Sequence, residues 1–330
     1  MDRRKITARL ALVALAVNGA VNAQPARRIY RIGILGLGTT SDMAGPQPSW
    51  PSTRALLGGM RDLGYVYGEQ YVTEPRGAGG NPDLYPALAA ELVRLKVDII
   101  LAGGGPTVPA LKQATTTIPI VMAASGDPVA DGYVQSLAHP GGNITGLSLQ
   151  STETTAKRFE LLKELVPGPA PVAVFWNGAS IQGWKAAEVI ARSRGWKILP
   201  IEIRDAGTIE AAFKTAIDGH ANAVLVFAAG VLFPQAQRVA ELAARNRLPA
   251  MYDLRQYVDA GGLISYGANI NQIWRQAAGF VDKIMKGAKP GDLPIEQPTK
   301  FELVINMKTA KALGLTIPQS MLLRADEVIQ

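Results

Sequence analysis

The sequence of 330 residues contains no cysteine and only two histidines, His139 and His220. The absence of cysteine excludes disulfide bonds, lipid attachment to an N-terminal cysteine and cysteine-ligated zinc. The two histidines lie far apart in the sequence, and neither belongs to a metal-binding or catalytic motif. We therefore expect neither a metal nor another cofactor.

Enzyme motifs are missing as well. The segment Gly36–Ser41 resembles a dinucleotide-binding loop, but Ser41 stands where the third glycine belongs, and a Pro-rich stretch follows. The chain has no Gly-x-x-x-x-Gly-Lys-Ser/Thr phosphate loop, and Ser125 lacks the flanking glycines of a nucleophile elbow. Because no acid–base pair stands out either, we do not expect an enzyme.

After residue 23 no uncharged apolar run is long enough to span a membrane, and residues 1–23 stand apart from the rest of the chain. Residues 1–23 combine a basic start with an apolar run from Leu10 to Val17 and with small residues before a cut after Ala23. This pattern is typical of a secretory signal peptide. An N-terminal membrane anchor is the alternative, but the run is shorter than the roughly 20 residues that a span needs. We expect export to a bacterial periplasm without a lipid anchor.

A strong excess of one charge is also absent. The formal charge is +7, and it falls to +4 without residues 1–23, which hold four basic side chains and one acidic one. No block of five or more Lys or Arg occurs, so a nucleic-acid partner is not expected. Apolar residues make up 48% of the chain and charged residues 18%, which is typical of a globular protein.

The sequence does contain a regular alternation of apolar, strand-like runs with helical patterns. This alternation predicts an α/β fold built from doubly wound parallel sheets. Two such runs, before and after about residue 147, favour two domains, and one sheet of ten strands is the alternative. The expected strands are Ile29–Gly36, Gln70–Glu74, Val97–Ala102, Ile118–Ala123, Val172–Trp176, Trp196–Ile203, Ala223–Phe227, Ala250–Met251 and Leu263–Tyr266.

Ligands of open parallel sheets bind beyond the carboxyl ends of the strands. Small, hydroxylic, amide-bearing, acidic and tyrosine residues follow the expected strands here. The candidate ligand-binding residues are Gly38, Thr39, Thr40, Gly105, Pro106, Thr107, Ser125, Asp127, Asn177, Ser180, Ala229, Tyr252, Asp253 and Tyr266.

Together these residue types would suit a small zwitterion. The helix start near Thr107 favours a carboxylate, and Asp127 and Asp253 could hold an ammonium group. Tyr252 and Tyr266 could stack on an aromatic ring or donate a hydrogen bond. Plain turn and cap chemistry is the alternative, above all for Asp127, which precedes a proline and could cap a helix.

Several blocks of the sequence resemble one protein family. They are Gly58–Glu69, Gly126–Val129, Ser136–Gly146, Gly261–Gly267, Leu293–Phe301 and Ala310–Pro318. The family is the substrate-binding proteins of ABC-type uptake systems, of the tryptophan/tyrosine-binding kind. The resemblance covers nearly all of the chain after the expected signal peptide.

The resemblance implies a type I periplasmic-binding fold, in which three crossovers join two α/β lobes around a ligand cleft. It assigns residues 24–146 and 263–290 to the N-terminal lobe, and residues 147–262 and 291–330 to the C-terminal lobe. It implies the hinged binding of an amino acid, aromatic or not, or of a related small carboxylate. The partners would be a membrane permease and, through it, an ATPase subunit, and the protein would be a monomer.

Three features depart from the family pattern. His139 stands where an arginine is more usual, the loop Asn177–Gln182 is short and lacks a proline, and Thr40–Pro51 is long and Pro-rich. Because these loops would contact the ligand, the identity of the ligand does not carry over. A periplasmic sensing partner of a signalling receptor is an alternative function, and an exported α/β enzyme is another.

Overall fold

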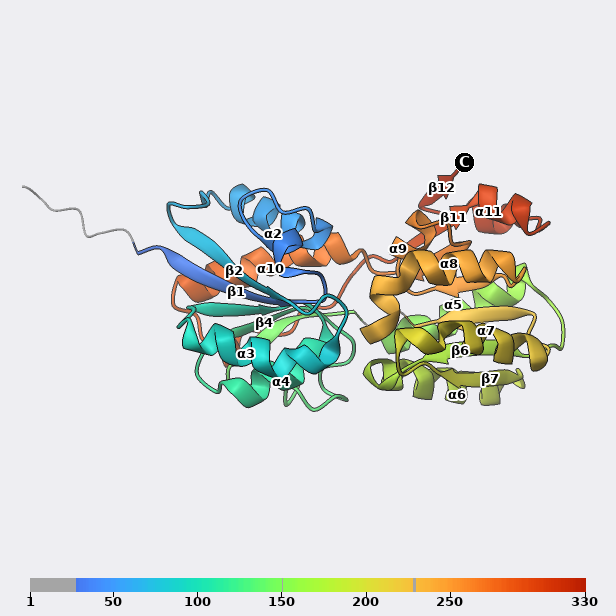
Figure 1. Cartoon of the computed structure of the whole chain (residues 1–330), viewed down its shortest axis with the longest axis horizontal. Helices are drawn as coiled ribbons and strands as arrows, with labels where there is room; N and C mark the ends of the chain where they lie inside the picture. The colour runs from blue at the N-terminus through green and yellow to red at the C-terminus, as the bar shows by residue number, and fades with distance from the viewer. Residues whose placement is uncertain (1–27, 150, 228–229) are drawn as a thin grey trace, which may run out of the picture.

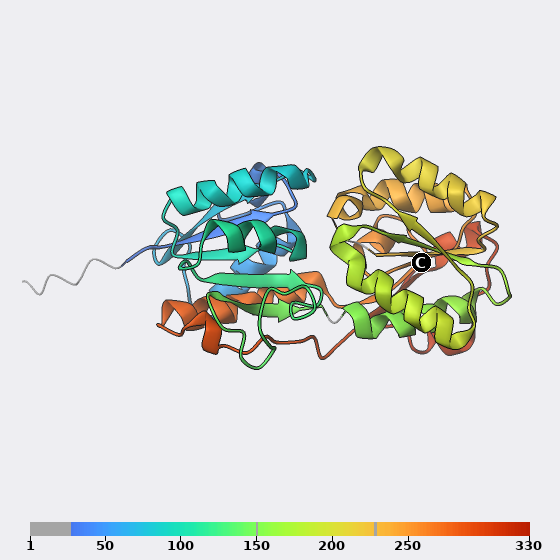
Figure 2. The ribbon, with the colours of Figure 1, turned by 90° about the horizontal axis from the view of Figure 1, so that it is seen from below.

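The computed structural model describes residues 28–149, 151–227 and 230–330. The chain forms two α/β lobes that lie side by side (Figure 1; Figure 2), and helices cover both faces of the sheet in each lobe. The expected signal peptide lies outside the described residues. Among the helices that are described, none is both long and apolar enough to cross a membrane.

The first lobe is built on a sheet of five parallel strands in the order β2-β1-β3-β4-β5. Helices α2 and α10 cover one face of this sheet and α3 and α4 the other (Figure 1). The strands are β1 (Tyr30–Gly36), β2 (Tyr71–Gly77), β3 (Ile99–Ala102), β4 (Ile120–Ser125) and β5 (Ile144–Ser148). The helices are α1 (Thr40–Met43), α2 (Pro51–Asp62), η1 (Pro82–Leu84), α3 (Tyr85–Arg94), η2 (Gly105–Thr107), α4 (Val108–Ala114), α10 (Ile270–Met285) and η6 (Pro290–Asp292).

The second lobe is built on seven strands in the order β12-β11-β10-β9-β8-β6-β7. All neighbours are parallel except β10 and β11, which are antiparallel. The strands are β6 (Val172–Trp176), β7 (Ile198–Glu202), β8 (Ala223–Val226), β9 (Ala250–Tyr252), β10 (Ile264–Gly267), β11 (Glu302–Asn306) and β12 (Glu327–Ile329). The helices are α5 (Ser151–Leu165), η3 (Gly178–Ser180), α6 (Ile181–Arg194), η4 (Ala206–Thr208), α7 (Ile209–Asp218), η5 (Gly230–Gln235), α8 (Ala236–Arg245), α9 (Gln256–Asp259), α11 (Met307–Ala312) and α12 (Gln319–Leu322).

The central strands and the edge strands of the two sheets differ in their residue types because they differ in burial and in hydrogen bonding. The central strands β1, β3, β4 and β8 are buried along nearly their whole length, so they are runs of apolar residues rather than alternating patterns. Pro75 and Pro200 lie in β2 and β7, which are both edge strands. An edge strand tolerates proline because its missing N–H is not needed by a neighbour.

The chain passes between the two sheets three times, from β5 to α5, from β10 to α10, and from the segment after η6 to β11. This connectivity and the two parallel-sheet lobes confirm the predicted fold class. The last crossing starts next to β5, where the Thr145 hydroxyl donates to the Leu293 carbonyl and Leu147 forms a β-bridge with Glu296.

The expected lobe boundaries were wrong in two places. Strand β10 pairs with β9 and β11 in the second sheet, so residues 264–267 do not belong to the N-terminal lobe. Conversely, β5 extends to Ser148 in the first sheet, and residues 291–296 run beside it. An apolar strand looks the same in either sheet, so the sequence pattern could not decide its partners.

Candidate functional site

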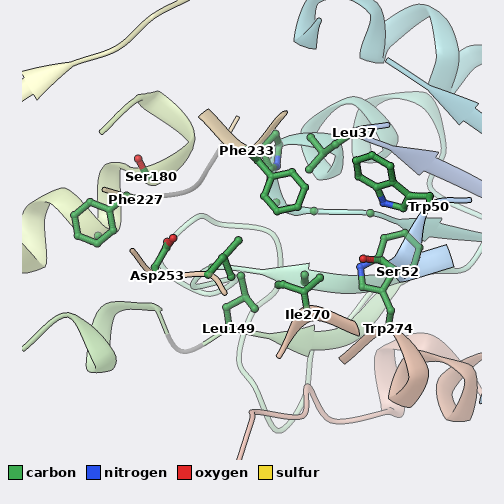
Figure 3. A pocket seen from close by; sticks show the side chains of 18 residues that line it. Leu37, Trp50, Ser52, Leu149, Ser180, Phe227, Phe233, Asp253, Ile270 and Trp274 are labelled. Atoms are coloured by element: carbon green, nitrogen blue, oxygen red, sulfur yellow. The ribbon is translucent and has the colours of Figure 1, made fainter. Parts of the chain in front are cut away.

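A cavity lies between the lobes, and both of them line it (Figure 3). It leaves about 100 Å³ in which the centre of a water molecule fits. Asp253 carries the only formal charge among the described lining residues, and most of the other side chains are apolar or aromatic. The lining residues are Leu37, Trp50, Ser52, Gly103, Gly104, Gly105, Pro106, Ala124, Gly126, Leu149, Ser180, Gly183, Phe227, Phe233, Asp253, Leu254, Ile270 and Trp274.

The ends of strands β3 and β4 form the first-lobe wall. The chain leaves β3 through Gly103–Gly105, and because glycine has no side chain, the backbone of this segment itself lines the cavity. The buried hydroxyl of Thr107 donates to the Gly104 carbonyl at 2.7 Å and thereby fixes this turn. The Ser125 hydroxyl, at the end of β4, is fully buried and has no hydrogen-bond partner among the described residues.

Two tryptophans add an aromatic surface to this wall. Trp274 on α10 is buried, and its ring lies against the backbone of Gly103. Trp50 comes from the Pro-rich loop before α2, and its indole packs on Gly38, where a Cβ would stand only 2.7 Å from the ring. Beside them, the Ser52 hydroxyl donates to the Asn271 side chain at 3.1 Å.

The second lobe supplies the opposite wall. The backbone N–H of Asn177 donates to the Ser180 hydroxyl at 3.0 Å, which holds Ser180 at the cavity as the chain enters α6. Gly183 allows the ring of Phe227 to approach, because a Cβ there would lie 2.9 Å from the ring. Asp253 follows directly after β9 and places its carboxylate at this wall (Figure 3).

Behind Asp253 lies Arg158 of α5, whose side chain is only 2% exposed. Its Nε donates to the Tyr266 carbonyl at 2.7 Å. Burial lowers the pKa of Arg158, and the carboxylate of Asp253 acts in the opposite direction and supports the charge. The carboxylate at the cavity therefore lies within the field of a buried guanidinium.

A second space adjoins the cavity and shares Leu37, Trp50, Ser52 and Phe233 with it. The rings of Trp50 and Phe233 lie 6.3 Å apart between the two spaces. The wall of the second space is more polar, with Asp42, Asp259, Gln256 and Asn271 among its residues.

The structure brings some of the predicted site residues together and not others. Gly105, Pro106, Ser180 and Asp253 line the cavity, and Gly38 and Thr39 line the adjoining space. Ala229 lies outside the described residues. The residues that line neither space are Thr40, Thr107, Ser125, Asp127, Asn177, Tyr252 and Tyr266.

Several of the predicted site residues make hydrogen bonds that support the walls. The Thr40 hydroxyl accepts from the Gly77 amide at 2.9 Å, and the Thr39 hydroxyl caps α1 by accepting from the Asp42 amide. Asp127 accepts from the amides of Val129 and Ala130 at 3.2 and 3.0 Å. The expected helix after Pro128 is wrong, because these bonds close a turn that does not continue as a helix.

The two tyrosines lie in the second lobe, away from both spaces. Tyr252 is fully buried and stacks on Tyr257 with ring centroids 4.6 Å apart, and burial raises the pKa of Tyr252. Tyr266 packs against Phe301 and offers its carbonyl to Arg158. Successive side chains of a strand point to opposite faces, and the rule of strand ends does not tell which residue faces a ligand.

The sequence interpretation missed the aromatic residues that dominate the walls. Trp50, Phe227, Phe233 and Trp274 were not among the candidates, although Phe227 ends a predicted strand and Trp50 lies in a loop that departs from the family pattern. Trp50 carries a signal that could have been used, because a large aromatic residue ends the unusual loop Thr40–Pro51. Trp274 shows no such signal, since it looks like any core residue of an amphipathic helix.

A family model described as ABC transporter substrate binding protein matches residues 51–329. The chain belongs to this family. Its members bind small ligands, work with an ABC permease and act in the periplasm or outside the cell, and they are not enzymes. The resemblance seen in the sequence is thus confirmed at the level of the family.

The comparisons with individual proteins agree with this assignment. A tyrosine-binding protein of Clostridioides difficile (strain R20291) is 25% identical over 265 residues, which are 79% of this chain and 76% of that protein. A conserved domain protein of Vibrio cholerae O1 biovar El Tor has a TM-score of 0.84 at 26% identity, with 91% of this chain and all of that one covered. An ABC domain of Streptococcus pneumoniae solved with L-Trp has a TM-score of 0.81 at 23% identity, with 92% of this chain and all of that one covered.

Proposed function

We propose that this substrate-binding protein takes an amino acid with an aromatic side chain into the cavity between the lobes and delivers it to a membrane permease. The observation that carries the proposal is the cavity wall itself. Four aromatic rings, those of Trp50, Phe227, Phe233 and Trp274, share it with a single carboxylate, that of Asp253. A mostly apolar cavity with few polar groups is typical of a small-molecule site.

The polar groups suit the two ends of an amino acid. Asp253 would accept the ammonium group. The glycine turn after β3 lines the cavity and offers backbone N–H donors for the carboxylate. The aromatic side chain would lie among the rings. The relatives named for tyrosine and solved with L-Trp add weight to this ligand class.

Delivery would follow from the two-lobe design. Each lobe contributes one wall, so a ligand that touches both favours the closed arrangement over the open one. We propose that a permease recognises the closed form, that a separate ATPase subunit powers uptake, and that the binding protein is a monomer. We further propose export through the signal peptide of residues 1–23, without a lipid anchor.

A thermal-shift panel tests the ligand class. It would contain aromatic amino acids, branched amino acids, aromatic carboxylates without an amine, and small amides. A ligand at a hundred times its dissociation constant stabilises the folded state by about 2.7 kcal/mol, which raises a melting temperature by several degrees. We expect the largest rise with an aromatic amino acid. A rise only with branched amino acids or with amine-free carboxylates would contradict the proposal.

A further inference from the structure

We infer that the first lobe carries a second binding site, a groove outside the ligand cavity that takes an elongated dianion with an apolar middle. The inference goes beyond the proposed function and does not depend on it. The groove lies between helix α2, the Pro-rich loop before it and the segment that leads into β2. It leaves about 840 Å³ in which the centre of a water molecule fits. None of its described lining residues lines the interlobe cavity or the space that adjoins it.

Two arginines of α2 line the groove two helical turns apart. Arg54 and Arg61 are separated by seven residues, which places their Cα atoms about 10.5 Å apart along the helix. Leu57 and Gly58 lie between them, at the spacing of three and four residues that defines one face of a helix. The α2 wall of the groove is therefore positively charged at both ends and neutral in the middle.

The protein neutralises neither guanidinium. Arg54 donates from Nε and Nη2 to the carbonyls of Pro48 and Ser49, at 3.2 and 2.9 Å, and so fixes the Pro-rich loop as the facing wall. Arg61 is exposed and has neither an ion pair nor a hydrogen bond to any residue that the structure describes. No Asp or Glu stands among the described residues that line the groove.

The acidic residues around the groove do not supply the missing charge. Asp62, which follows Arg61, pairs with Arg275 of α10. Glu69, in the turn before β2, does not line the groove. Asp42 lines the space that adjoins the interlobe cavity instead. The positive charge of the groove is therefore available to an anion from outside the chain.

Tyrosine rings and prolines form the neutral part of the groove. Tyr67 and Tyr71 pack edge to face with their ring centroids 5.4 Å apart, and Tyr71 is buried whereas Tyr67 is half-buried. The Tyr65 hydroxyl donates to Asp282 of α10 at 2.7 Å, which fixes this ring. Two prolines of the Pro-rich loop line the groove as well. These rigid surfaces can cover the rings or methylene groups of a ligand.

The distribution of charge selects the ligand. A guanidinium binds a carboxylate or a sulfate through two parallel hydrogen bonds, so two guanidinium groups at a fixed separation favour a molecule with an anionic group at each end. Because an exposed ion pair alone contributes little, the middle of the ligand must be covered by the tyrosines and prolines at the same time. The groove has the volume of small-molecule sites, which is roughly 300–1,000 Å³. A monoanion would leave one guanidinium unused.

The test uses calorimetric titration of the full protein with biphenyl-4,4′-dicarboxylate and biphenyl-4-carboxylate, which share their rings and differ in one carboxylate. We expect the wild-type protein to bind the dicarboxylate at least about tenfold more tightly, the scale of one charge-assisted contact. In Arg61→Gln the affinity for the dicarboxylate should fall to that for the monocarboxylate, because one guanidinium remains. The affinity for the monocarboxylate should change little, since Arg54 still receives its charge.

Two further variants serve as controls. Arg94→Gln removes another exposed arginine without an ion pair among the described residues, but on α3, which covers the other face of the first sheet (Figure 1). It should leave both affinities unchanged, which separates a local contact from the overall charge. Tyr67→Leu removes a ring and no charge, so it should weaken both probes alike. Arg61→Gln should keep the wild-type melting temperature, because Arg61 holds no other described residue in place.

Three outcomes would overturn the inference. The first is no binding of the dicarboxylate to the wild-type protein, or an unchanged difference between the two probes in Arg61→Gln. The second is displacement of the dicarboxylate by L-tyrosine, which would place the probe in the interlobe cavity. The third is binding of a polyglutamate peptide without binding of the dicarboxylate, which would assign the groove to a protein partner. None of these results bears on the thermal-shift panel, so the proposed function is tested separately.

Discussion

The indole of Trp50 and the phenyl ring of Phe233 lie 6.3 Å apart across the interlobe cavity, at an interplanar angle of 56°. Trp50 precedes α2 in the first lobe, and Phe233 lies in η5 of the second. The neighbouring residue Pro234 approaches the Gly80 backbone of the first lobe, so this side of the cavity has direct contacts between the lobes. The aromatic pair therefore lines the cavity and brings the two lobes into contact.

Replacing Trp50 by alanine should weaken the binding of an aromatic amino acid by tenfold or more. The variant loses an aromatic pair, worth about 0.5–1.5 kcal/mol, and also the surface that the indole offers to the ligand. Isothermal titration with L-tyrosine would measure the loss. Trp196→Ala is the matched control, because this half-buried tryptophan packs on Phe159 in the second lobe, away from the cavity. Equal affinities in the two variants would contradict the placement of the site.

The two aspartates that the sequence made equal candidates should behave differently. Asp127→Ala should leave the ligand affinity unchanged and lower the free energy of unfolding by about 1 kcal/mol, because the side chain caps its own turn. Asp127→Ser, which keeps a capping oxygen, should recover most of that stability. Asp253→Asn should lower the affinity for an amino acid. The account would be wrong if Asp127→Ala abolished binding.

Two helical glycines in the first lobe should respond in opposite directions to alanine. Gly279 on α10 has open space where a Cβ would be, so Gly279→Ala should raise the free energy of unfolding by about 0.8–1.0 kcal/mol. At Gly59 on α2, a Cβ would collide with the Arg275 carbonyl and lie 2.8 Å from the Ala278 Cβ. Gly59→Ala should therefore lower the free energy of unfolding by about 1–3 kcal/mol. Thermal unfolding, followed by circular dichroism, would detect both changes, and a gain in stability at Gly59 would refute this view of the α2–α10 contact.

Stability should decline in strongly alkaline solution. Burial raises the pKa of Tyr65, Tyr71, Tyr85 and Tyr133 to about 12, and at Tyr65 the hydrogen bond to Asp282, 2.7 Å long, adds to the effect. Because the folded protein holds these protons more tightly than the unfolded chain, the stabilisation is complete below pH 10 and is lost as the pH rises toward 12. Ultraviolet titration of tyrosinate, read beside the melting temperature, would test this. Ionisation of all nine tyrosines near pH 10 without unfolding would contradict it.

The alternation of strands and helices was enough to predict the fold class, because parallel sheets covered on both faces require that pattern. The pattern did not reveal the partners of β10, since Ile264 and its neighbours are apolar enough for either sheet. Strand β5 was missed because its five residues include a glycine and two hydroxyl side chains that are nevertheless buried. Such a segment becomes a strand through its place at the sheet edge rather than through propensity.

The sequence indicated where in the fold the candidate site lies better than it indicated which residues line it. The rule of strand ends located Gly105, Ser180 and Asp253, which the structure brings to one cavity. It also selected Tyr252, which turned out to be a core residue. The rings of Trp50, Phe233 and Trp274 come from a loop, a 3₁₀ segment and a helix of both lobes. Their convergence depends on how the lobes meet, and no local pattern contains that information.

The measurement that tests the central claim most directly is a tryptophan-fluorescence titration with L-tyrosine, using excitation selective for tryptophan. Trp50 and Trp274 line the cavity, whereas Trp184 stacks on Trp176 and Trp196 packs on Phe159. We predict a saturable change in emission that is lost in Trp50→Phe/Trp274→Phe and kept in Trp184→Phe/Trp196→Phe. A saturable change that survives the first pair of substitutions and vanishes with the second would place the ligand outside this cavity and contradict the account.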